Sequence, residues 1–371
     1  MLFDVVDNLD EKLFERHIIS FAKKTDSPFQ FKSSITLHHL FSENQILKPK
    51  SFIQKGIIVG KILCRLYRKL ATFPKAAVIV PFLARPTTCY TVLTQLFSKR
   101  RIIASVHTTE SKYMEFNFDS RFKKIVEHLM VKIACRGADK IVAVSESVKS
   151  DLIRNYLIPE EDIRVISNPI NLSKIERLKT NPAPIWLKLG TKKTIFVHIG
   201  RLSAEKNHKL LIQAAANLID SGLDFVILIA GAGDQEINIR SWIQAAKLQD
   251  RVIMLGSVNN PYALMASARA LLLTSHYDSS PMVLKEAMAS GTAVISVDCP
   301  HGPADILKDG KYGLLVPPGD PQALAGAMLT VARDDLLFKR LVRNGHKRAL
   351  IYDIEKIIPQ WEKMFWQVQR A

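Results

Sequence analysis

Short runs of apolar and β-branched residues alternate with stretches of helical periodicity along the whole chain. Several runs are apolar at every position, as parallel strands covered by helices on both faces must be. This alternation predicts an α/β protein with doubly wound parallel sheets. In the first half we expect strands at residues 17–23, 35–40, 76–83, 101–108, 140–145 and 163–169. In the second half we expect them at residues 194–202, 225–233, 251–257, 270–276, 293–298 and 313–317.

A polar segment with Pro169, Pro182 and Pro184 separates the two series of strands. Proline and polar residues are typical of connections between domains. The sequence therefore predicts a Rossmann-like domain at 1–168, a linker at 169–193, a second Rossmann-like domain at 194–350 and a helix at 351–371. This last helix carries Trp361, Phe365 and Trp366, and we expect it to pack back on the first domain.

The composition allows two cores and assigns most of the charge to the first half. The chain has 371 residues, of which 47% are hydrophobic, and a net charge of +17. Residues 1–190 hold 31 Lys and Arg against 18 Asp and Glu, whereas the remainder holds 21 against 17. This imbalance indicates an anionic partner for the first half: a lipid surface, a nucleic acid or a phosphorylated substrate.

The cysteines and the apolar runs indicate a cytoplasmic protein. The four cysteines are isolated in sequence and have no metal-ligand or redox spacing, which favours a reducing compartment without structural zinc. We find no signal peptide in the acidic opening "MLFDVVDNLDEKLFERH". The run Gly56–Leu70 is interrupted by four basic residues, so it is too short and too charged to span a bilayer.

Residues with functional chemistry follow the predicted strands at their carboxyl ends, where parallel sheets bind ligands. They are His107, Arg201, Lys206, Gly231, Gly233, Gly256, Asp278 and Glu286. Their position predicts an active site in a crevice between two domains.

The stretch "GRLSAEKNHKLLIQAAANL" places Arg201 and Lys206 around the start of a helix. Free backbone N–H groups and two cations form an anion site that fits a diphosphate. The alternative is a capped helix with solvated surface cations. The turn "LIAGAGDQ" lacks the full three-glycine fingerprint of dinucleotide sites, so Gly231 and Gly233 are more simply interpreted as a tight turn.

The stretch "TSHYDSSPMVLKEAMASGTAVISVD" places Asp278 in a loop and Glu286 inside the following helix. Asp278 there accepts hydrogen bonds from ligand hydroxyls, and Glu286 reaches a ribose. We expect Ser279 and Ser280 to cap the helix, with Pro281 in its first turn. The N–H groups of Met282 and Val283 then point into the crevice. The alternative for Glu286 is a salt bridge to Lys285 or Arg269.

Taken together, "GRLSAEKNH", "LIAGAGDQ", "VIMLGSV", "SSPMVLKEAMASGTAVISVDCPHGPADIL" and "GKYGLLVPPGDPQALAGAM" resemble the retaining GT-B glycosyltransferases of family four (glycosyl transferases group 1). The similarity covers residues 194–335. A looser similarity over residues 1–168 includes "SVH" and "VISNPIN" and matches the acceptor domain of the same family.

The resemblance implies two Rossmann-like domains facing a central cleft, with a nucleotide-diphosphate sugar held mainly by the second domain. Arg201 and Lys206 match the residues on the diphosphate, Asp278 the acid on the donor-sugar hydroxyls, and Glu286 the acid on the ribose.

The same resemblance implies further donor contacts from Gly200, Gly231, Pro281, Met282 and Val283. Leu255 and Gly256 line the base, and His107 of the first domain matches the histidine near the sugar. The donor is a co-substrate, for which we expect a UDP-sugar, and no cofactor is implied. The sequence contains no Asp-x-Asp, so no metal is expected.

Two features depart from the family pattern. The leading acid is usually Glu and is Asp278 here, which is one methylene shorter. The segment "VVDNLDEKLFERHIISFAKK" resembles the end of the family's first helix and its second strand. We therefore expect the first strand and its glycine-rich loop to be absent, through truncation, a misassigned start or divergence with loss of activity.

The resemblance implies retaining transfer of a sugar to a polysaccharide, lipopolysaccharide or lipid-linked acceptor, which we expect to be independent of a metal ion. A catalytically impaired sugar-nucleotide-binding protein of the same fold is the alternative. A nucleic-acid-binding protein ranks last, because no stacking motif or reader fold accompanies the charge, and we expect no nucleic-acid partner.

The stretch Lys48–Lys75 interleaves basic with apolar residues, and one helical face collects Ile57, Ile58, Ile62, Leu63 and Leu66. One interpretation is a peripheral helix on the anionic inner face of the plasma membrane, where each basic residue contributes roughly 1 kcal/mol. "SKRR" (98–101) and "RFKK" (121–124) add charge. The other interpretation is an ordinary helix that covers the sheet and has a solvated basic side.

Overall fold

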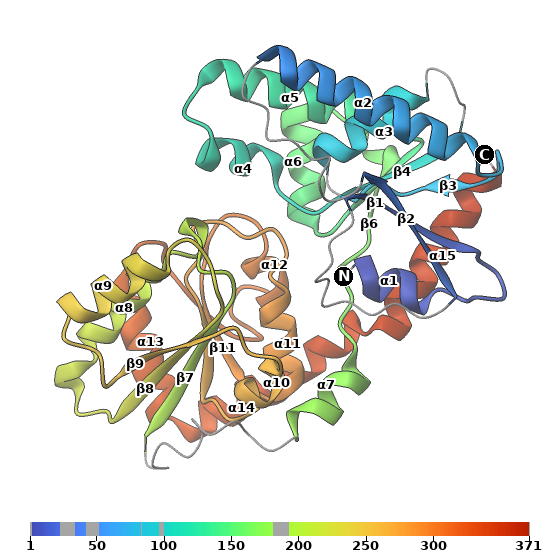
Figure 1. The fold of residues 1–371 in the computed structure, drawn as a ribbon. Coiled ribbons are helices and arrows are strands. Elements are labelled where there is room, and N and C mark those ends of the chain that lie inside the picture. The colour runs from blue at the N-terminus through green and yellow to red at the C-terminus, as the bar shows by residue number, and fades with distance from the viewer. Residues whose placement is uncertain are drawn as a thin grey trace. The chain divides into compact units, whose positions relative to one another are not determined.

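A computed structural model describes residues 2–22, 34–41, 52–82, 84–95, 100–180 and 193–370 of the chain. The chain forms two compact units (Figure 1). Unit 1 comprises Met1–Pro169 with Ile354–Ala371, and unit 2 comprises Ile170–Asp353. Each of the twelve apolar runs contains a strand, which confirms the predicted alternation.

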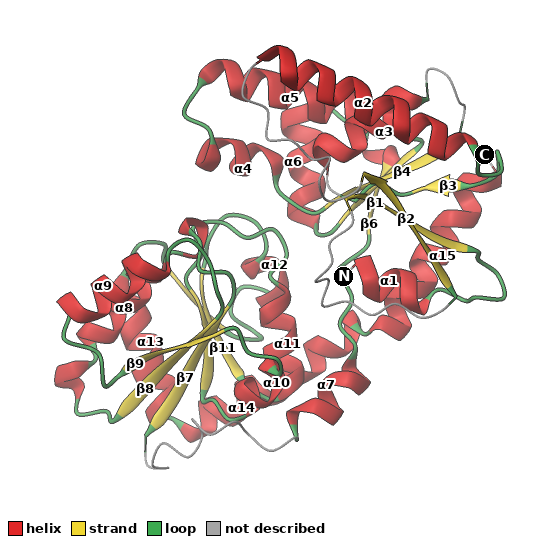
Figure 2. Ribbon diagram, viewed as in Figure 1, coloured by secondary structure: helices red, strands yellow, loops and turns green. Residues whose placement is uncertain are grey.

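Unit 2 contains one parallel sheet of six strands in the order β12-β11-β10-β7-β8-β9 (Figure 2). The strands are β7 (Thr194–Ile199), β8 (Phe225–Ala230), β9 (Val252–Gly256), β10 (Ala270–Leu273), β11 (Ala293–Val297) and β12 (Leu314–Val316). Sequence neighbours β7 and β8 pair in register from Thr194↔Phe225 to Ile199↔Ala230.

Successive residues of β8 enter opposite cores. Phe225 and Ile227 belong to the first core, whereas Val226 and Leu228 belong to the second. Because helices cover both faces, the strand is apolar at every position. The first face is covered by α8 (His208–Asn217), α9 (Glu236–Ala245) and α13 (Pro321–Arg333). The second is covered by α10 (Pro261–Ala266), α11 (Met282–Ser290) and α12 (Pro303–Leu307), and α14 (Asp335–Ala349) contributes to both cores.

The first part of the expected linker, residues 170–180, packs as part of unit 2. Ile175 of α7 (Leu172–Lys179) is 1% exposed and packs in the second core. Residues 170–180 therefore belong to this unit, whereas residues 181–192 of the expected linker lie outside the described residues.

The described strands of unit 1 form two separate parallel sheets. One has the order β3-β4-β5-β6 and the other pairs β1 with β2. The strands are β1 (Arg16–Ala22), β2 (Ile35–Phe41), β3 (Val78–Ile79), β4 (Arg101–Val106), β5 (Lys140–Ala143) and β6 (Ile163–Val165). The helices are α1 (Leu2–Asn8), α2 (Phe52–Ala71), α3 (Cys89–Thr94), α4 (Glu110–Asn117), α5 (Arg121–Arg136), α6 (Glu146–Tyr156) and α15 (Ile354–Arg370). No strand among the described residues joins the two sheets.

The C-terminal helix α15 packs on unit 1. Trp361, which is 2% exposed, and Met364 share a core with Ile103 of β4 and Val142 of β5. Burial of this aromatic face removes apolar area from water and attaches the end of the chain to the first sheet.

The apolar face of α2 is largely used for packing. Leu66 and Leu70 are buried against Leu40 and Phe41 of β2, and Ile62 packs against the same cluster. For these residues the structure favours the interpretation of a helix that covers a sheet, while Ile57 is 53% exposed. Residues 48–51 of the predicted peripheral stretch lie outside the described residues.

Candidate functional site

Lys206 and Asp278 of unit 2 form an ion pair across two loops. Lys206 ends a short turn after β7, and Asp278 lies between β10 and α11. Their Nζ and Oδ2 atoms are 2.7 Å apart, and the side chains are 17% and 16% exposed. The Thr274 hydroxyl donates to the Lys206 carbonyl oxygen at 2.8 Å. Because β7 and β10 are neighbours in the sheet, their carboxyl ends bring this cation and this carboxylate together.

Arg201 lies on the same loop as Lys206 and is largely exposed. Its side chain is 78% exposed, and its guanidinium donates to Glu205 Oε1 at 2.8 Å. The Glu205 carbonyl oxygen accepts from the His276 N–H at 2.8 Å, which fixes this part of the loop. An exposed ion pair of this kind contributes little to stability, so the guanidinium can turn toward an incoming anion at small cost.

Three glycines stand together at the ends of β7, β8 and β9. A Cβ on Gly231 would lie 1.8 Å from the Gly200 carbonyl oxygen, and Gly231 has a φ of +149°. The Gly231 N–H donates to the Gly256 carbonyl oxygen at 2.8 Å. Gly231 is therefore required by close backbone packing, which agrees with its interpretation as a tight turn. Leu255, beside Gly256, packs against the second core.

The helix α11 begins at Met282, and its N-cap residue has no side chain that could cap it. Pro281 occupies the N-cap position, so the expected serine cap is wrong. Ser280 Oγ instead accepts a hydrogen bond from Lys285 Nζ at 3.1 Å. The first-turn N–H groups, which include those of Met282 and Val283, carry the partial positive charge of the helix N-terminus.

The backbone of Gly302 packs closely against the loop that carries Asp278. The sequence analysis did not predict this contact. A Cβ on Gly302 would lie 2.2 Å from the Asp278 carbonyl oxygen, and its φ is +130°. The signal available in the sequence is the glycine of "CPHGPADIL", directly after β11.

Lys285 is a buried cation beneath this loop. Its side chain is 1% exposed, and Nζ lies 4.3 Å from the centre of the Tyr352 ring. Burial and, to a smaller extent, the charge of Arg348 lower the pKa of Lys285 to about 7, against the opposing effect of Asp278 and Glu286. Sequence reasoning treated Lys285 only as a partner for Glu286. The signal for its burial was its position as the single lysine within the largely apolar helix "PMVLKEAMA".

Glu286 lies in α11, and of its two expected basic partners Arg269 is engaged elsewhere. Arg269 pairs with Asp335 Oδ1 at 2.6 Å, and Lys285 Nζ is directed to Ser280. The Tyr262 hydroxyl lies 3.5 Å from Glu286 Oε1.

Two buried histidines lie beside Lys206. The rings of His198 and His208 meet edge to face with centres 4.6 Å apart, and both side chains are at most 2% exposed. Burial and the charge of Lys206 lower the pKa of His208 to about 4, and burial also lowers the pKa of His198. Both rings are neutral at pH 7, so neither histidine adds a positive charge beside Lys206.

His107 belongs to unit 1 and follows β4. Its ring stacks on Phe82 with centres 5.4 Å apart, and its Nε2 lies 2.9 Å from Ser105 Oγ. Burial lowers the pKa of His107 to about 4. The imidazole is therefore neutral at pH 7 and can donate or accept a hydrogen bond.

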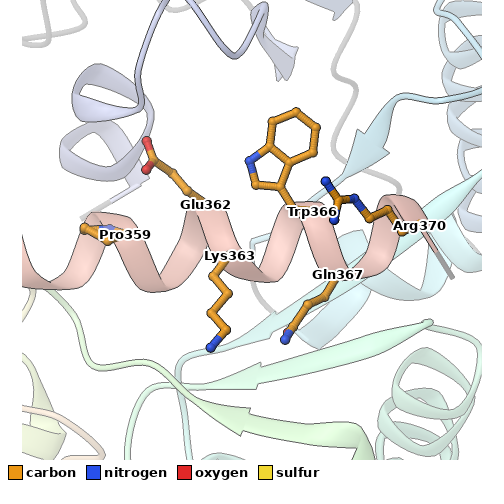
Figure 3. Close-up of a pocket in the computed structure, with 6 residues that line it drawn as sticks. All are labelled: Pro359, Glu362, Lys363, Trp366, Gln367 and Arg370. Carbon is orange, nitrogen blue, oxygen red and sulfur yellow. The ribbon is translucent and has the colours of Figure 1, made fainter.

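The hollow shown in Figure 3 is not part of this site. Its lining comes from one helix of unit 1, α15: Pro359, Glu362, Lys363, Trp366, Gln367 and Arg370. None of the predicted site residues lines it. Among the described residues we find no group of three or more His, Cys, Asp or Glu placed to hold a metal ion. No helix in the described part of the chain is long and apolar enough to cross a membrane.

This fold and these motifs define a glycosyltransferase with the GT-B fold. The family model described as Glycosyl transferases group 1 matches residues 186–348, and that described as Glycosyltransferase Family 4 matches residues 3–174. The chain therefore belongs to this glycosyltransferase family.

Among curated proteins, the chain is 28% identical over 317 residues to a transferase of Campylobacter jejuni. Its name is N-acetylgalactosamine-N,N'-diacetylbacillosaminyl-diphospho-undecaprenol 4-alpha-N-acetylgalactosaminyltransferase, and the match covers 85% of this chain and 81% of that protein. The chain is also 30% identical over 237 residues to the lipopolysaccharide 1,6-galactosyltransferase of Escherichia coli, covering 62% of this chain and 61% of that protein.

Solved structures share the fold. Sucrose-phosphate synthase from Thermosynechococcus elongatus superposes with a TM-score of 0.81 at 19% identity, covering 98% of this chain and 91% of that chain. Anabaena Alr3699/HepE in complex with UDP and glucose superposes with a TM-score of 0.75 at 19% identity, covering 98% and 94%.

Proposed function

We propose that this protein transfers a sugar, with retention of configuration and without a metal ion, from a UDP-sugar to a polysaccharide, lipopolysaccharide or lipid-linked acceptor. The observation that carries the proposal is the ion pair of Lys206 and Asp278. Asp278 lies in the loop directly before α11, whose N-cap residue is Pro281. An ammonium group and free helix N–H groups bind a diphosphate, and a carboxylate beside them binds sugar hydroxyls.

In this proposal the residues of unit 2 hold the donor. Lys206, Arg201 and the N–H groups of Met282 and Val283 stabilise the leaving diphosphate as its negative charge grows. Asp278 accepts hydrogen bonds from the donor sugar, and Glu286 accepts one from the ribose. Leu255 and Gly256 line the base.

His107 has an orienting role in this proposal. Burial holds its pKa near 4, so a neutral ring positions a sugar hydroxyl and does not act as a strong base. The reaction then proceeds on the face of the sugar from which the diphosphate departs, through an oxocarbenium-like transition state.

The acceptor class is proposed from the relatives. The name of the Campylobacter protein includes a diphospho-undecaprenol sugar, and that of the Escherichia coli protein a lipopolysaccharide. We propose that this enzyme acts on the cytoplasmic side of the plasma membrane, in peripheral contact with its anionic lipids.

The proposal is tested by measuring transfer, and hydrolysis of UDP-sugars, with Lys206→Ala. We expect kcat to fall by about 10²–10³-fold, because the growing charge on the diphosphate loses one preplaced cation. The matched control is Arg240→Ala, which removes an exposed cation of unit 2 paired with Glu236 and should leave kcat unchanged. Turnover of Lys206→Ala equal to that of the wild type would refute the diphosphate role.

A sugar-nucleotide-binding protein without activity remains the alternative, favoured by one observation. The described strands of unit 1 form two separate sheets, and no strand among the described residues joins them. Calorimetric binding of UDP-sugars with no release of UDP, with or without acceptor glycolipids, would favour this alternative over the transferase.

A further inference from the structure

The outward face of α5 carries an apolar stripe. The helix packs inward through Val131, Ala134 and Cys135, which are at most 2% exposed. On the opposite face Phe122 is 74% exposed, Ile125 60% and Leu129 54%, with Val126 and Ile133 at 40% each. The spacing of these positions, i, i+3, i+4, i+7 and i+11, places all five on one side of the helix.

This concentration of exposed apolar side chains differs from the rest of the described surface. Five of the sixteen exposed large apolar residues of the described chain lie on α5. In unit 2, Ile237 and Leu336 are exposed on different helices, and the adjacent Leu350 and Ile351 form a short pair, not a stripe along a helix. Single exposed apolar residues are ordinary, whereas a contiguous stripe marks a surface that another body covers.

Basic residues border the stripe. Arg121 and Lys132 lie on one side of it, Lys123 lies on the other, and Arg136 lies at its end. Glu127, the single acidic residue of the helix, lies five positions after Phe122 and so on the side of α5 away from the stripe. Burial, Cys89 and then Glu127 raise the pKa of Tyr90 in α3, which agrees with this position. The outward face of α5 therefore combines apolar and positive groups only.

A second long helix extends the positive surface. Both α2 and α5 pack against α3, and Figure 1 shows these two helices on the same side of unit 1. Lys61 and Arg68 of α2 are exposed. Between Glu43 and Glu110 the sequence contains no acidic residue, so nothing on α2 offsets these charges.

We propose that α5 is the membrane-docking helix of this protein, and that its stripe of Phe122, Ile125 and Leu129 inserts into the interface of a bilayer rich in anionic lipid. The inference deepens the proposed function and rests on it for the lipid-linked acceptor. A helix with an apolar face and a basic rim lies in the plane of such an interface, with its apolar side chains at the acyl boundary and its cations among the phosphates. A second copy of the chain would bring two positive rims together, which opposes self-association through this face.

Docking through α5 would also place unit 1, which carries His107, at the membrane that holds a lipid-linked acceptor. His107 is followed by α4, and residues 118–120 alone separate α4 from α5. The stripe therefore belongs to the same unit as the histidine proposed to orient the sugar.

The test is co-sedimentation with vesicles of phosphatidylcholine, with and without phosphatidylglycerol. The wild type should bind the anionic vesicles and bind the neutral ones weakly. The double variant Phe122→Ser/Leu129→Ser should bind anionic vesicles about 10-fold less, because insertion energy scales with the apolar area that enters the interface. The matched control Ile237→Ser/Leu336→Ser changes two exposed apolar residues of unit 2 and should bind like the wild type.

A second pair of variants tests the charge. Lys123→Gln/Lys132→Gln should weaken binding to anionic vesicles and reduce its dependence on salt, whereas Lys209→Gln/Lys339→Gln in unit 2 should not. Equal binding of the wild type and the Phe122→Ser/Leu129→Ser variant would overturn the proposal. So would a wild-type dimer that this variant converts to a monomer in sedimentation without lipid.

Hydrolysis of the UDP-sugar without vesicles separates this inference from the proposed function. The α5 variants should hydrolyse the donor at the wild-type rate, because Phe122 and Leu129 are not part of the donor site. A wild-type protein that binds vesicles through α5 but turns over no donor would overturn the transferase proposal and leave the docking surface standing.

Discussion

The two units differ in the continuity of their sheets and in how much apolar surface their helices leave exposed. In unit 2 one continuous sheet is covered on both faces, and its loops are fixed by backbone contacts such as Gly231 against Gly200. In unit 1 the described strands form two sheets, and α5 leaves an apolar stripe exposed. Close packing therefore fixes the loops of unit 2, which we propose to bind the donor, whereas unit 1 is distinguished by the exposed apolar surface of α5.

Among the predicted changes, Gly231→Ala should have the largest effect on stability, and that effect should be confined to unit 2. The added Cβ meets the Gly200 carbonyl oxygen, and the φ of +149° disfavours any side chain. We expect a loss of about 3 kcal/mol in the free energy of unfolding, from strain and overpacking. Hydrogen exchange resolved by peptide should show lost protection in unit 2 and unchanged protection in β4 and β5 of unit 1. Uniform loss in both units would contradict independent packing.

Lys285→Met should change how the stability of unit 2 depends on pH. The pKa of Lys285 is about 7 in the folded chain and about 10.4 when unfolded. Between pH 7 and 10 the unfolded chain therefore binds more protons at this group, and the group makes stability rise with pH. From pH 7 to 9 the wild type should gain up to about 2 kcal/mol relative to Lys285→Met in urea unfolding. Parallel pH profiles of the two proteins would show that folding does not lower the pKa of Lys285.

Gly60→Ala in unit 1 should have the smallest effect and the opposite sign to Gly231→Ala. Gly60 lies inside α2, and a Cβ there would meet nothing within 4 Å. Alanine restricts the unfolded chain and favours the helix, so we expect a gain of about 0.5–1 kcal/mol in urea unfolding. A loss of stability would mean that this face of α2 is covered.

Much of unit 2 was predictable because its signals are local. The apolar runs located all six strands, and the spacing of Asp278 and Glu286 located the loop and helix that carry them. The contacts between distant segments were not predictable. The pairing of Asp278 with Lys206 joins residues 72 positions apart, and Ser280 accepts from Lys285 rather than capping its helix.

The two basic amphipathic helices of unit 1 show the same limit. In sequence both α2 and α5 combine Lys and Arg with regularly spaced apolar residues. Periodicity identifies an apolar face but does not say whether another element covers it. Tertiary packing buries Leu66 and Leu70 of α2 and leaves Phe122 and Leu129 of α5 exposed.

The central claim is that unit 2 grips the diphosphate and ribose of a nucleotide sugar. The most direct measurement is a crystal structure of the protein soaked with UDP. We expect diphosphate oxygens within about 2.7–3.2 Å of Lys206 Nζ and of the first N–H groups of α11, with a ribose hydroxyl on Glu286. Ordered UDP bound elsewhere, with the pair of Lys206 and Asp278 untouched, would contradict the account.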